Sequence, residues 1–243
     1  MRYLTLSDIH ANAQALDAVL EATPTKSYDQ ILCLGDLVGY GGDPNVVVER
    51  IRALDPLLVI RGNHDKVSLG IRQADDFNYV AREAAEWTLG ALSASNREYL
   101  AGLPAGPQTV DDVLEICHGS PQDEDAYLFD SLDALAAAKA TRRPLCLFGH
   151  THLPCVYRLQ ADRFENLPAE GEIVIEKSAT YLMNPGSVGQ PRDGDSRAAF
   201  AIVDTGTGRV TFRRVGYRTD LARARIIAAG LPDSLAHRLE LGR

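Results

Sequence analysis

The first sixty residues alternate between short apolar stretches and helical patterns, and this alternation limits the possible folds more than any other feature. Apolar stretches at residues 2–6, 30–34 and 57–60 are typical of buried strands. Asn12 and Asp43 lie at good helix starts between them, and apolar residues follow each at helical spacing. Strands separated by helices predict βαβ units, and such units build a parallel sheet.

The middle of the chain has a different pattern. Apolar residues within residues 77–91 repeat at helical spacing, and residues 95–98, which begin with Ser95, have the form of a capping box. We interpret residues 76–103 as a helical insertion.

Strand-like runs dominate the rest of the chain. They lie at residues 113–117, 145–148, 155–159, 172–175, 180–183, 198–203 and 209–214. Helical patterns return only at residues 131–139 and from Thr219 onward. We therefore expect the second half to form a largely antiparallel or mixed sheet against the first half. The length of 243 residues fits one large domain, so we expect residues 1–243 to fold as a single unit.

Charge and cysteine content limit the class of partner and the compartment. The net charge of −8 disfavours a surface that follows extended nucleic acid, because backbone phosphates bind clustered Lys and Arg. Cys33, Cys117, Cys146 and Cys155 lie in apolar runs without zinc or redox spacing, so we expect buried thiols in a reducing compartment. The sequence has neither the pattern of a signal peptide nor an apolar segment of membrane-spanning length, and we expect a cytoplasmic protein with no membrane partner.

Five polar motifs interrupt these elements, and each follows a predicted strand. They are Asp8-Ile9-His10, Gly35-Asp36, Gly62-Asn63-His64-Asp65, His118-Gly119 and Gly149-His150-Thr151-His152. In α/β sheets, ligand groups converge at the carboxyl ends of strands. Asp8 and His10 lie two residues apart, as do the two histidines of the last motif, so on an extended backbone each pair shares a face. We expect the five motifs to meet at one site.

The histidines concentrate in these motifs, because only His237 of the six histidines lies outside them. Each motif alone has a simple structural alternative. Residues 62–65 are compatible with an ordinary turn, and a lone His118 with a hydrogen-bonded core histidine. The ordered combination of all five, with glycine in four of them, instead indicates a functional site.

The sequence resembles the calcineurin-like metallophosphoesterase superfamily. The family pattern of D-x-H, G-D, G-N-H-D, H and G-H-x-H runs from residue 8 to residue 152, and a family-like loop at residues 184–187 (Asn-Pro-Gly-Ser) extends the match across most of the chain. The resemblance implies an α/β fold, namely a four-layer α-β-β-α sandwich of two mixed sheets flanked by helices. It also implies a metal-dependent hydrolase that acts on phosphate esters as a phosphodiesterase or phosphatase.

The resemblance further implies two groups of metal ligands that share one carboxylate. One divalent cation would be held by Asp8, His10, Asp36 and His152, and the other by Asp36, Asn63, His118 and His150. A hydroxide bridging the two cations would attack phosphorus. Because the ligand carboxylates and the hydroxide neutralise only part of the cationic charge, a positive site remains for the phosphate. Ligands without a thiolate suit manganese, iron or zinc.

The residue that follows the ligand Asn63 has an expected catalytic role. We expect His64 to act as a general acid towards the departing oxygen or to stabilise the charge on phosphorus, and Asp65 to orient it.

The candidate substrate contacts come from other loops. They are Asn12, Asn184, Gly186, Ser187 and Arg192. Each has a structural alternative: Asn12 is also a candidate helix cap, and residues 184–187 are a candidate tight turn. Tyr40 and Arg192 are candidates for the pocket mouth, with a solvated loop as their alternative.

One departure from the family affects the choice of activity. Residues 35–40 lack the Asp-Arg-Gly ending of the serine/threonine protein phosphatase and diadenosine tetraphosphatase branch, so the phosphate-binding arginine of that branch is missing there. The sequence is more similar to the small prokaryotic phosphodiesterase-like branch, and we expect a small phosphorylated substrate. The alternatives are a nuclease of the same superfamily, which the acidic charge disfavours, and a non-catalytic protein-binding scaffold on this fold, which the complete ligand set disfavours.

Overall fold

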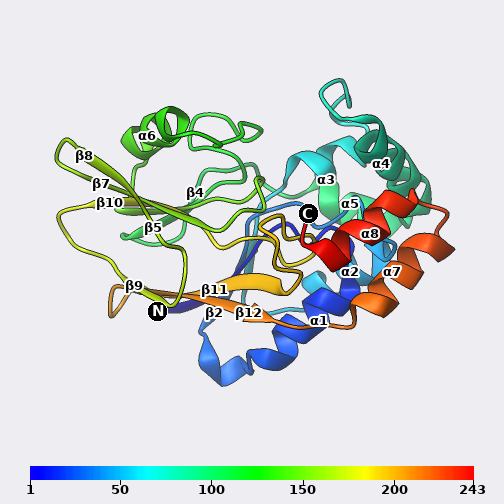
Figure 1. Cartoon of the computed structure of the whole chain (residues 1–243), viewed down its shortest axis with the longest axis horizontal. Coiled ribbons are helices and arrows are strands. Elements are labelled where there is room, and N and C mark those ends of the chain that lie inside the picture. Colours follow the sequence, from blue (N-terminus) through cyan, green and yellow to red (C-terminus); the bar gives the residue numbers. More distant parts are fainter.

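The computed structural model describes residues 1–243 and contains two mixed sheets of six strands each (Figure 1). The first sheet has the order β3 (Leu57–Val59), β2 (Gln30–Cys33), β1 (Arg2–Leu6), β11 (Ala198–Asp204), β12 (Arg209–Val215) and β9 (Glu172–Val174). The second sheet has the order β4 (Gln108–Thr109), β5 (Leu114–Ile116), β6 (Leu145–Leu147), β10 (Thr180–Asn184), β7 (Cys155–Gln160) and β8 (Arg163–Leu167). In each sheet three neighbouring strands are parallel and the others are antiparallel to their neighbours.

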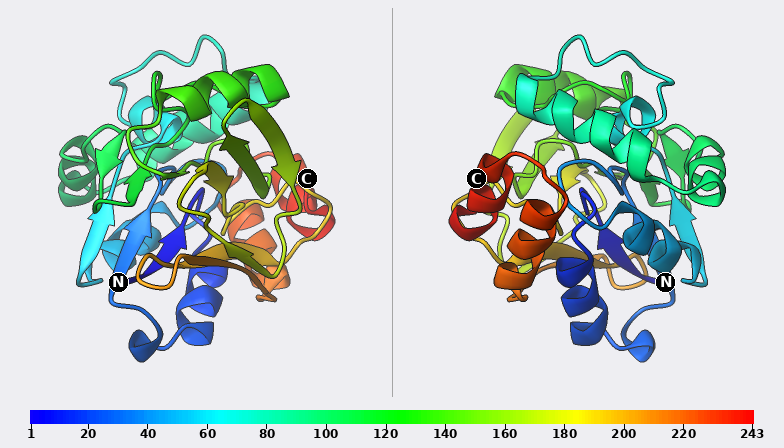
Figure 2. Two further views of the ribbon diagram at one scale, coloured as in Figure 1. Left: turned by 90° about the vertical axis from the view of Figure 1, so that its left-hand side faces the viewer. Right: turned by 90° about the vertical axis from the view of Figure 1, so that its right-hand side faces the viewer.

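Helices cover the outer faces of both sheets. Helix α1 (Ala13–Ala22) lies against the first sheet and α6 (Ser131–Ala140) against the second, so that Figure 2 shows the sheets between a blue and a green helix. The remaining helices gather at one end of the sandwich (Figure 1). They are α2 (Pro44–Arg52), α3 (Asn63–Val67), α4 (Tyr79–Ala91), α5 (Ala94–Ala101), α7 (Thr219–Ala228) and α8 (Asp233–Leu241), and a short 3-10 helix lies at Thr25–Ser27. The expected four-layer α-β-β-α sandwich is confirmed.

The alternation of side chains along β1 explains why two sheets pack together. Leu4 and Leu6 are fully buried in a core between the first sheet and the helices α1 and α2. Tyr3 points the other way, into a second core between the two sheets. Ala137 of α6 and Phe148 pack in a third core beyond the second sheet. Three cores therefore separate four layers, and burial of a leucine side chain such as Leu4 contributes about 1.5–3 kcal/mol.

The second half of the chain contributes strands to both sheets. Strand β11 returns beside β1, with Leu4 opposite Ile202, and brings β12 and β9 into the first sheet. The expectation of a separate second-half sheet is wrong in this respect. Two strands, β4 and β8, do not coincide with an apolar run of the sequence. Strand β4 has only two residues, and β8 has the polar sequence Arg-Phe-Glu-Asn-Leu.

Two helices occupy the segment that we interpreted as a helical insertion. The second, α5, begins two residues earlier than the predicted capping box, because the side chain of Ser93 rather than Ser95 accepts the capping hydrogen bond from the Asn96 N–H. The C-terminal helical pattern also forms two helices, separated by Gly230, whose φ of 71° is left-handed. Helices α4, α7 and α8 share a small apolar core that includes Tyr40.

The four cysteines are free thiols. Cys33, Cys117 and Cys146 are buried as expected, whereas Cys155 is half-buried at the start of β7. None of the helices is both long and apolar enough to span a membrane.

Candidate metal centre

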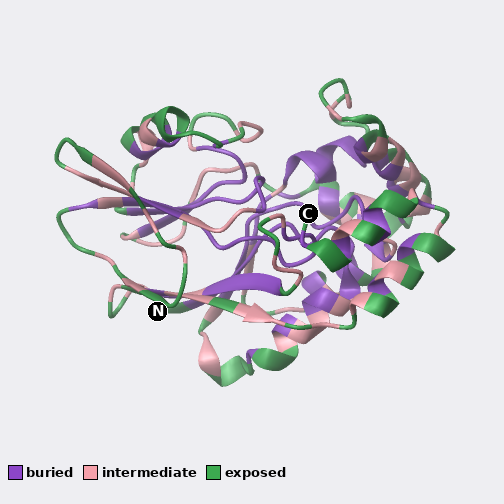
Figure 3. Ribbon diagram, in the orientation of Figure 1, coloured by how far each residue is buried: buried purple, intermediate pink, exposed green.

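The five polar motifs meet where the parallel strands of the two sheets end. Strands β1, β2 and β3 lead to Asp8, Asp36 and Asn63, and strands β5 and β6 lead to His118 and His150. The loops at this place are buried, unlike the outer helices and hairpins (Figure 3). All seven predicted ligands are at most 3% exposed. Buried carboxylates require partners of opposite charge, and buried neutral imidazoles require hydrogen-bond or metal partners.

Two groups of side chains present potential ligand atoms to a common centre. The first consists of Asp8, His10, Asp36 and His152, and the second of Asp36, His118 and His150, with ligand atoms within 4.8 Å of one another in each group. Asp36 belongs to both groups. Its Oδ2 atom lies 3.6 Å from His10 Nε2 and 3.4 Å from His118 Nε2. The Oδ1 atom of Asn63 lies 3.0 Å from His118 Nε2, beside the second group.

Backbone carbonyls orient three of these histidine rings. The Nδ1 atoms of His10, His118 and His152 lie 3.0, 2.8 and 2.7 Å from the carbonyl oxygens of Val38, Leu34 and Gln190. Because a carbonyl only accepts, each Nδ1 donates a proton, and the lone pair of each neutral ring is on Nε2, which faces the group. An imidazole held in this way by an outer hydrogen bond is typical of metal-binding histidines.

Most of the side-chain atoms that face the centre are hydrogen-bond acceptors, and no donor lies opposite them. His10 Nε2 and His152 Nε2 lie 3.0 Å apart, although both rings donate outward through Nδ1. The Oδ2 atom of Asp36 is buried and has no hydrogen-bond partner. Lone pairs at this distance repel unless a cation or a proton lies between them. The residues therefore fit metal ions, in both donor type and orientation.

The pKa values of the cluster residues also indicate that the site needs positive charge. Burial raises the pKa of Asp8 to about 6. Burial opposes protonation of His118, but the Asp36 carboxylate beside it raises the pKa of His118 to about 10. Burial lowers the pKa of His10 to about 4. Without an ion, the shift at His118 favours a proton that partly replaces the charge of a cation, and the shift at Asp8 shows that its carboxylate lacks such charge.

The backbone at these ligands is not extended, contrary to our expectation. Asp8 and His10 have φ values of 51° and 49°, and Asp36, His150 and His152 have values of 53°, 66° and 61°. Non-glycine residues rarely adopt this left-handed conformation, which costs on the order of 1–2 kcal/mol each. Tight turns bring the side chains of Asp8 and His10, and likewise those of His150 and His152, to the same centre. Backbone strain of this kind concentrates at functional sites.

Close backbone contacts hold the turns together. Gly62 lies against Asp36, where an added Cβ atom would be 2.1 Å from Asp36 Oδ1. The same oxygen accepts a hydrogen bond of 2.8 Å from the His64 N–H in the first turn of α3. A side chain at position 62 would therefore displace the shared carboxylate.

The structure places His64 beside the cluster but corrects the expected role of Asp65. The His64 ring is 4% exposed, and its centre is 4.8 Å from that of His10. No hydrogen bond joins the carboxylate of Asp65 to this ring, whose Nδ1 atom has no partner. It accepts hydrogen bonds from the N–H groups of Gly62, Leu37 and Val38. Asp65 therefore fastens the loop after Asp36 to α3, and the prediction that it orients His64 is wrong.

Asn12 forms hydrogen bonds within the fold through both its side-chain oxygen and its side-chain nitrogen. Its Oδ1 accepts from the Ala15 N–H and caps α1, and its Nδ2 donates to the Gly189 carbonyl. The helix-cap alternative is thus confirmed for Asn12.

The loop after β10 forms hydrogen bonds with the turns that carry Asp8 and His150. Asn184 donates to the Gly149 carbonyl and accepts from the Gly186 N–H, while Ser187 donates to the Asp8 carbonyl. Asn184 and Ser187 are fully buried. The predicted substrate contacts at Asn184, Gly186 and Ser187 are therefore replaced by contacts that hold Asp8 and the Gly149 turn in place.

Tyr40 and Arg192 lie together at the side of His10. Tyr40 is only 6% exposed, so its solvated-loop alternative is wrong, and its ring centre lies 4.7 Å from that of His10 and 4.4 Å from that of His64. The half-buried Arg192 lies over the Tyr40 ring at 5.8 Å and donates to Gln190 Oε1. Its Nε atom has no partner. The positive charge of Arg192 also lowers the pKa of His10, after the larger effects of burial and of Asp36. The guanidinium group is therefore near the cluster.

Two aromatic contacts at the cluster were not predicted from the sequence. Tyr127 stacks on His150 with ring centres 3.6 Å apart, and Phe77 lies 4.5 Å from the His64 ring. Both residues lie outside the helices and strands. Tyr127 belongs to no motif or periodic pattern, whereas Phe77 opens the helical pattern predicted over residues 77–91 but lies just before α4.

Comparisons with known proteins show the family of the chain. The calcineurin-like phosphoesterase superfamily domain matches residues 1–208. A metallophosphoesterase from Sphaerobacter thermophilus, known from a crystal structure, is 40% identical with a TM-score of 0.85, over 100% of this chain and 99% of that one. An uncharacterized protein of Methanocaldococcus jannaschii is 37% identical over 98% of this chain and 97% of its own length.

A more distant relative shares the fold. The hypothetical protein PH1004 from Pyrococcus horikoshii OT3 is 22% identical with a TM-score of 0.80, over 100% of this chain and 98% of that one. Family match, relatives and converging ligands lead to one conclusion: the chain belongs to the calcineurin-like phosphoesterase superfamily.

Proposed function

We propose that this protein hydrolyses phosphate esters at a centre of two divalent cations. Asp8, His10, Asp36 and His152 would hold one cation, and Asp36, Asn63, His118 and His150 the other. The observation that carries the proposal is the unpartnered Oδ2 atom of Asp36, which lies 3.6 and 3.4 Å from imidazole nitrogens of the two groups. A carboxylate in this position is suited to bridge two cations.

The chain's own residues would bind and orient the substrate. When bound, the two cations supply Lewis acidity and an activated water for in-line attack on phosphorus. Arg192, with its unpartnered Nε near the cluster, is suited to bind a phosphoryl oxygen, in place of the family arginine that residues 35–40 lack. His64 is suited to donate a proton or hydrogen bond to the departing oxygen. The nitrogen and oxygen ligands suit manganese, iron or zinc.

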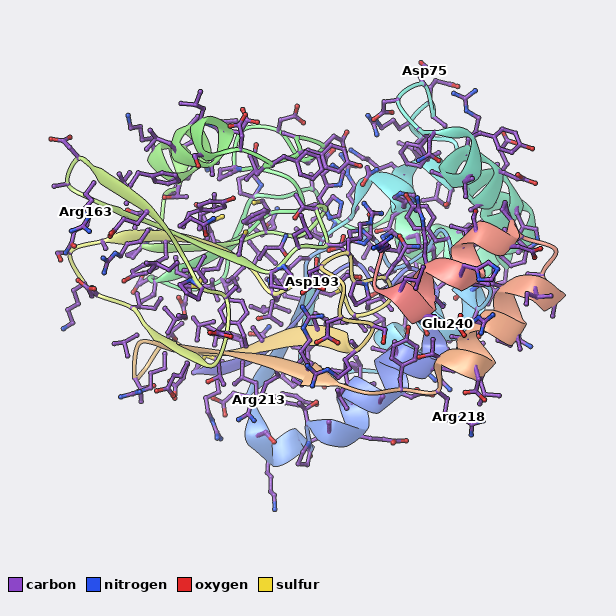
Figure 4. The ribbon with its side chains drawn as sticks, in the orientation of Figure 1. Asp75, Arg163, Asp193, Arg213, Arg218 and Glu240 are labelled. Carbon is purple, nitrogen blue, oxygen red and sulfur yellow. The ribbon has the colours of Figure 1, made fainter.

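A small phosphorylated substrate agrees best with the charge distribution. Arg163, Arg213 and Arg218 lie at separate places on the periphery, with the acidic Asp75 and Glu240 at others (Figure 4). Three exposed arginines, Arg197, Arg209 and Arg218, also pair with carboxylates, and paired arginines do not offer the free basic stripe that extended nucleic acid requires. These ion pairs and the net charge of −8 argue against the nuclease alternative, and the complete buried ligand set argues against a non-catalytic scaffold.

The proposal also includes a cytoplasmic location. Four free cysteines support it, because free thiols persist in a reducing compartment.

The experiment that tests the proposal compares a chromogenic phosphomonoester with a chromogenic phosphodiester across a panel of manganese, iron and zinc. We expect metal-dependent hydrolysis of at least one ester, lost after chelation and restored by metal. The matched control is Asp36→Asn, which keeps the side-chain shape but removes the shared charge. We expect its turnover to fall by at least about 100-fold. No hydrolysis of either ester by metal-loaded protein, or near-normal turnover of the variant, would contradict the proposal.

A further inference from the structure

His150 is held differently from the other three histidines of the cluster. Its Nε2 atom lies 3.1 Å from the Asp125 carbonyl oxygen, whereas His10, His118 and His152 use Nδ1 for their outer hydrogen bonds. The Asp125 carbonyl therefore requires a proton on Nε2, which leaves Nδ1 as the atom for an ion.

The same loop also fixes the plane of the His150 ring. Tyr127 stacks on it with ring centres 3.6 Å apart and an interplanar angle of 25°. Asp125 and Tyr127 both belong to the long connection between β5 and α6, at residues 117–130. The orientation of His150 thus depends on where this connection lies.

Lys66 attaches this connection to α3. Its ammonium group lies 2.8 Å from Glu124 Oε1 and 2.7 Å from Asp125 Oδ1, and its side chain is only 6% exposed. Arg61 adds a bidentate pair with Glu124 at 3.1 and 2.8 Å. A lysine so deeply buried, with two carboxylates that are about one-fifth exposed, forms a more rigid contact than a surface ion pair.

Lys66 lies three residues after Asn63 in α3, whose five residues also include His64. The ion pairs therefore join two ligand-bearing elements of one metal group: α3, with Asn63, and the connection that orients His150. The hydrogen bonds of Asp8, His10 and His152, in the first group, go to other residues than Lys66, Glu124 and Asp125.

We propose that Lys66 is a positioning residue for the metal site formed by Asp36, Asn63, His118 and His150, and that it sets the affinity of this site separately from the other. Lys66 acts through the Asp125 carbonyl and the Tyr127 ring and does not itself contact a cation. This inference rests on the proposed function, since it requires that two cations bind.

Calorimetric titration of metal-free protein with Mn²⁺ tests this role without measuring activity. We expect two binding events in the wild-type protein, and the event that disappears in His118→Ala belongs to the second group. Lys66→Met should weaken that event by about 10- to 100-fold and leave the other unchanged, as is typical when an outer partner of a metal ligand is removed. Lys66→Arg, which keeps the charge, should restore most of the affinity.

A distant ion-pair cluster provides the matched control. Arg158 also pairs with two carboxylates, those of Glu165 and Glu176, on a strand of the second sheet. Arg158→Met should leave both binding events unchanged. If Lys66→Met leaves the second event unchanged, or weakens both events equally, the positioning role is overturned. A single binding event in the wild-type protein would instead overturn the two-cation centre itself.

A second variant keeps the test valid if Lys66→Met does not fold. Tyr127 is 39% exposed, so Tyr127→Leu removes the ring against His150 at little cost to the core. We expect a selective loss of affinity in the second event. Phe129→Leu is its control, because the 63% exposed Phe129 stacks on Tyr127 with ring centres 5.0 Å apart and has no aromatic contact with His150. Equal titrations of the two variants would contradict the proposal.

Discussion

Each cluster histidine donates one ring N–H to a backbone carbonyl, and this contact fixes its orientation before any ion binds. The carbonyls of Val38, Leu34, Gln190 and Asp125 serve this purpose. The lone pairs that remain converge on Asp36, whose Oδ2 atom has no donor. At the scale of single residues, the site is thus preorganised for cations rather than assembled by them.

His64 is the residue whose role depends most directly on the leaving group. We expect His64→Ala to retain both metals and to lose the most activity on esters with poor leaving groups, because those need a proton donor. The measurement is kcat for a series of aryl phosphate esters of increasing leaving-group pKa. His237→Ala is the control, because His237 is exposed on α8. An equal loss across the series would remove the proton-donor role.

Asp65 has a structural role that predicts a loss of stability. Its two oxygens accept three backbone N–H groups, and the side chain is 1% exposed. In Asp65→Asn, an amide N–H₂ would face these donors, so we expect the free energy of unfolding of metal-free protein to fall by about 1–3 kcal/mol. Urea unfolding measures this difference. Unchanged stability would show that the carboxylate is not needed by the loop after Asp36.

At the scale of elements, tight turns present most of the ligands, and Asn63 is the one ligand that lies in a helix, at the start of α3. The turns after β1 and β6 place Asp8, His10, His150 and His152 in left-handed conformations. Their neighbours press against them closely: an added Cβ atom on Gly189 would be 1.8 Å from the Ile9 carbonyl oxygen. The turn after β1 therefore depends on a segment nearly 180 residues away in the sequence.

This contact predicts opposite effects for two glycine substitutions. Gly189→Ala should lower the free energy of unfolding by about 1–3 kcal/mol or more, because the methyl group meets backbone that cannot move aside. Gly90→Ala is the matched control within α4, where an added Cβ meets nothing within 4 Å. It should raise stability by at most about 1 kcal/mol, since Gly90 lies in the last turn of α4 and alanine favours a helix over glycine. Thermal unfolding compares the two, and equal shifts would argue against the close contact.

The sequence predicted these elements best where patterns are local. Strand β1 matches the predicted residues 2–6, and Asn12 caps α1 as its position indicated. The convergence of the five motifs was also predictable, because parallel strands end at a common edge. The left-handed turns were not, since that conformation is uncommon even for Asp and His, which adopt it more often than other non-glycine residues. Contacts such as Lys66 with Glu124, 58 residues apart, leave no local pattern at all.

At the scale of the whole molecule, the last third of the chain packs beside the first strand and supports the site there. Strand β11 pairs with β1, and the loop before it supports Asp8 through Ser187. This long-range pairing could not be read from periodicity, whereas the four layers followed from the family resemblance. The ligands come from loops after strands of both sheets. Cations bound between the sheets should therefore stabilise the entire fold.

Metal removal tests this stabilisation. At a metal concentration 100 times the Kd, binding adds about 2.7 kcal/mol to the free energy of unfolding, which for a chain of this size corresponds to a Tm shift of about 5–10 °C. We expect a chelator to lower the Tm of the wild-type protein by this amount. Asp36→Asn, which binds metal less well, should show a smaller shift. A Tm that is insensitive to metal and chelator would contradict metal binding to the folded state.

The most direct test of the two-cation centre is anomalous diffraction from crystals grown with Mn²⁺. We predict two anomalous peaks about 3.5–4 Å apart, as in other two-metal sites. The Asp36 carboxylate should lie between them, with His10 and His152 at one peak and His118 and His150 at the other. A single peak, no peak, or two peaks that do not share Asp36 would contradict the centre described here.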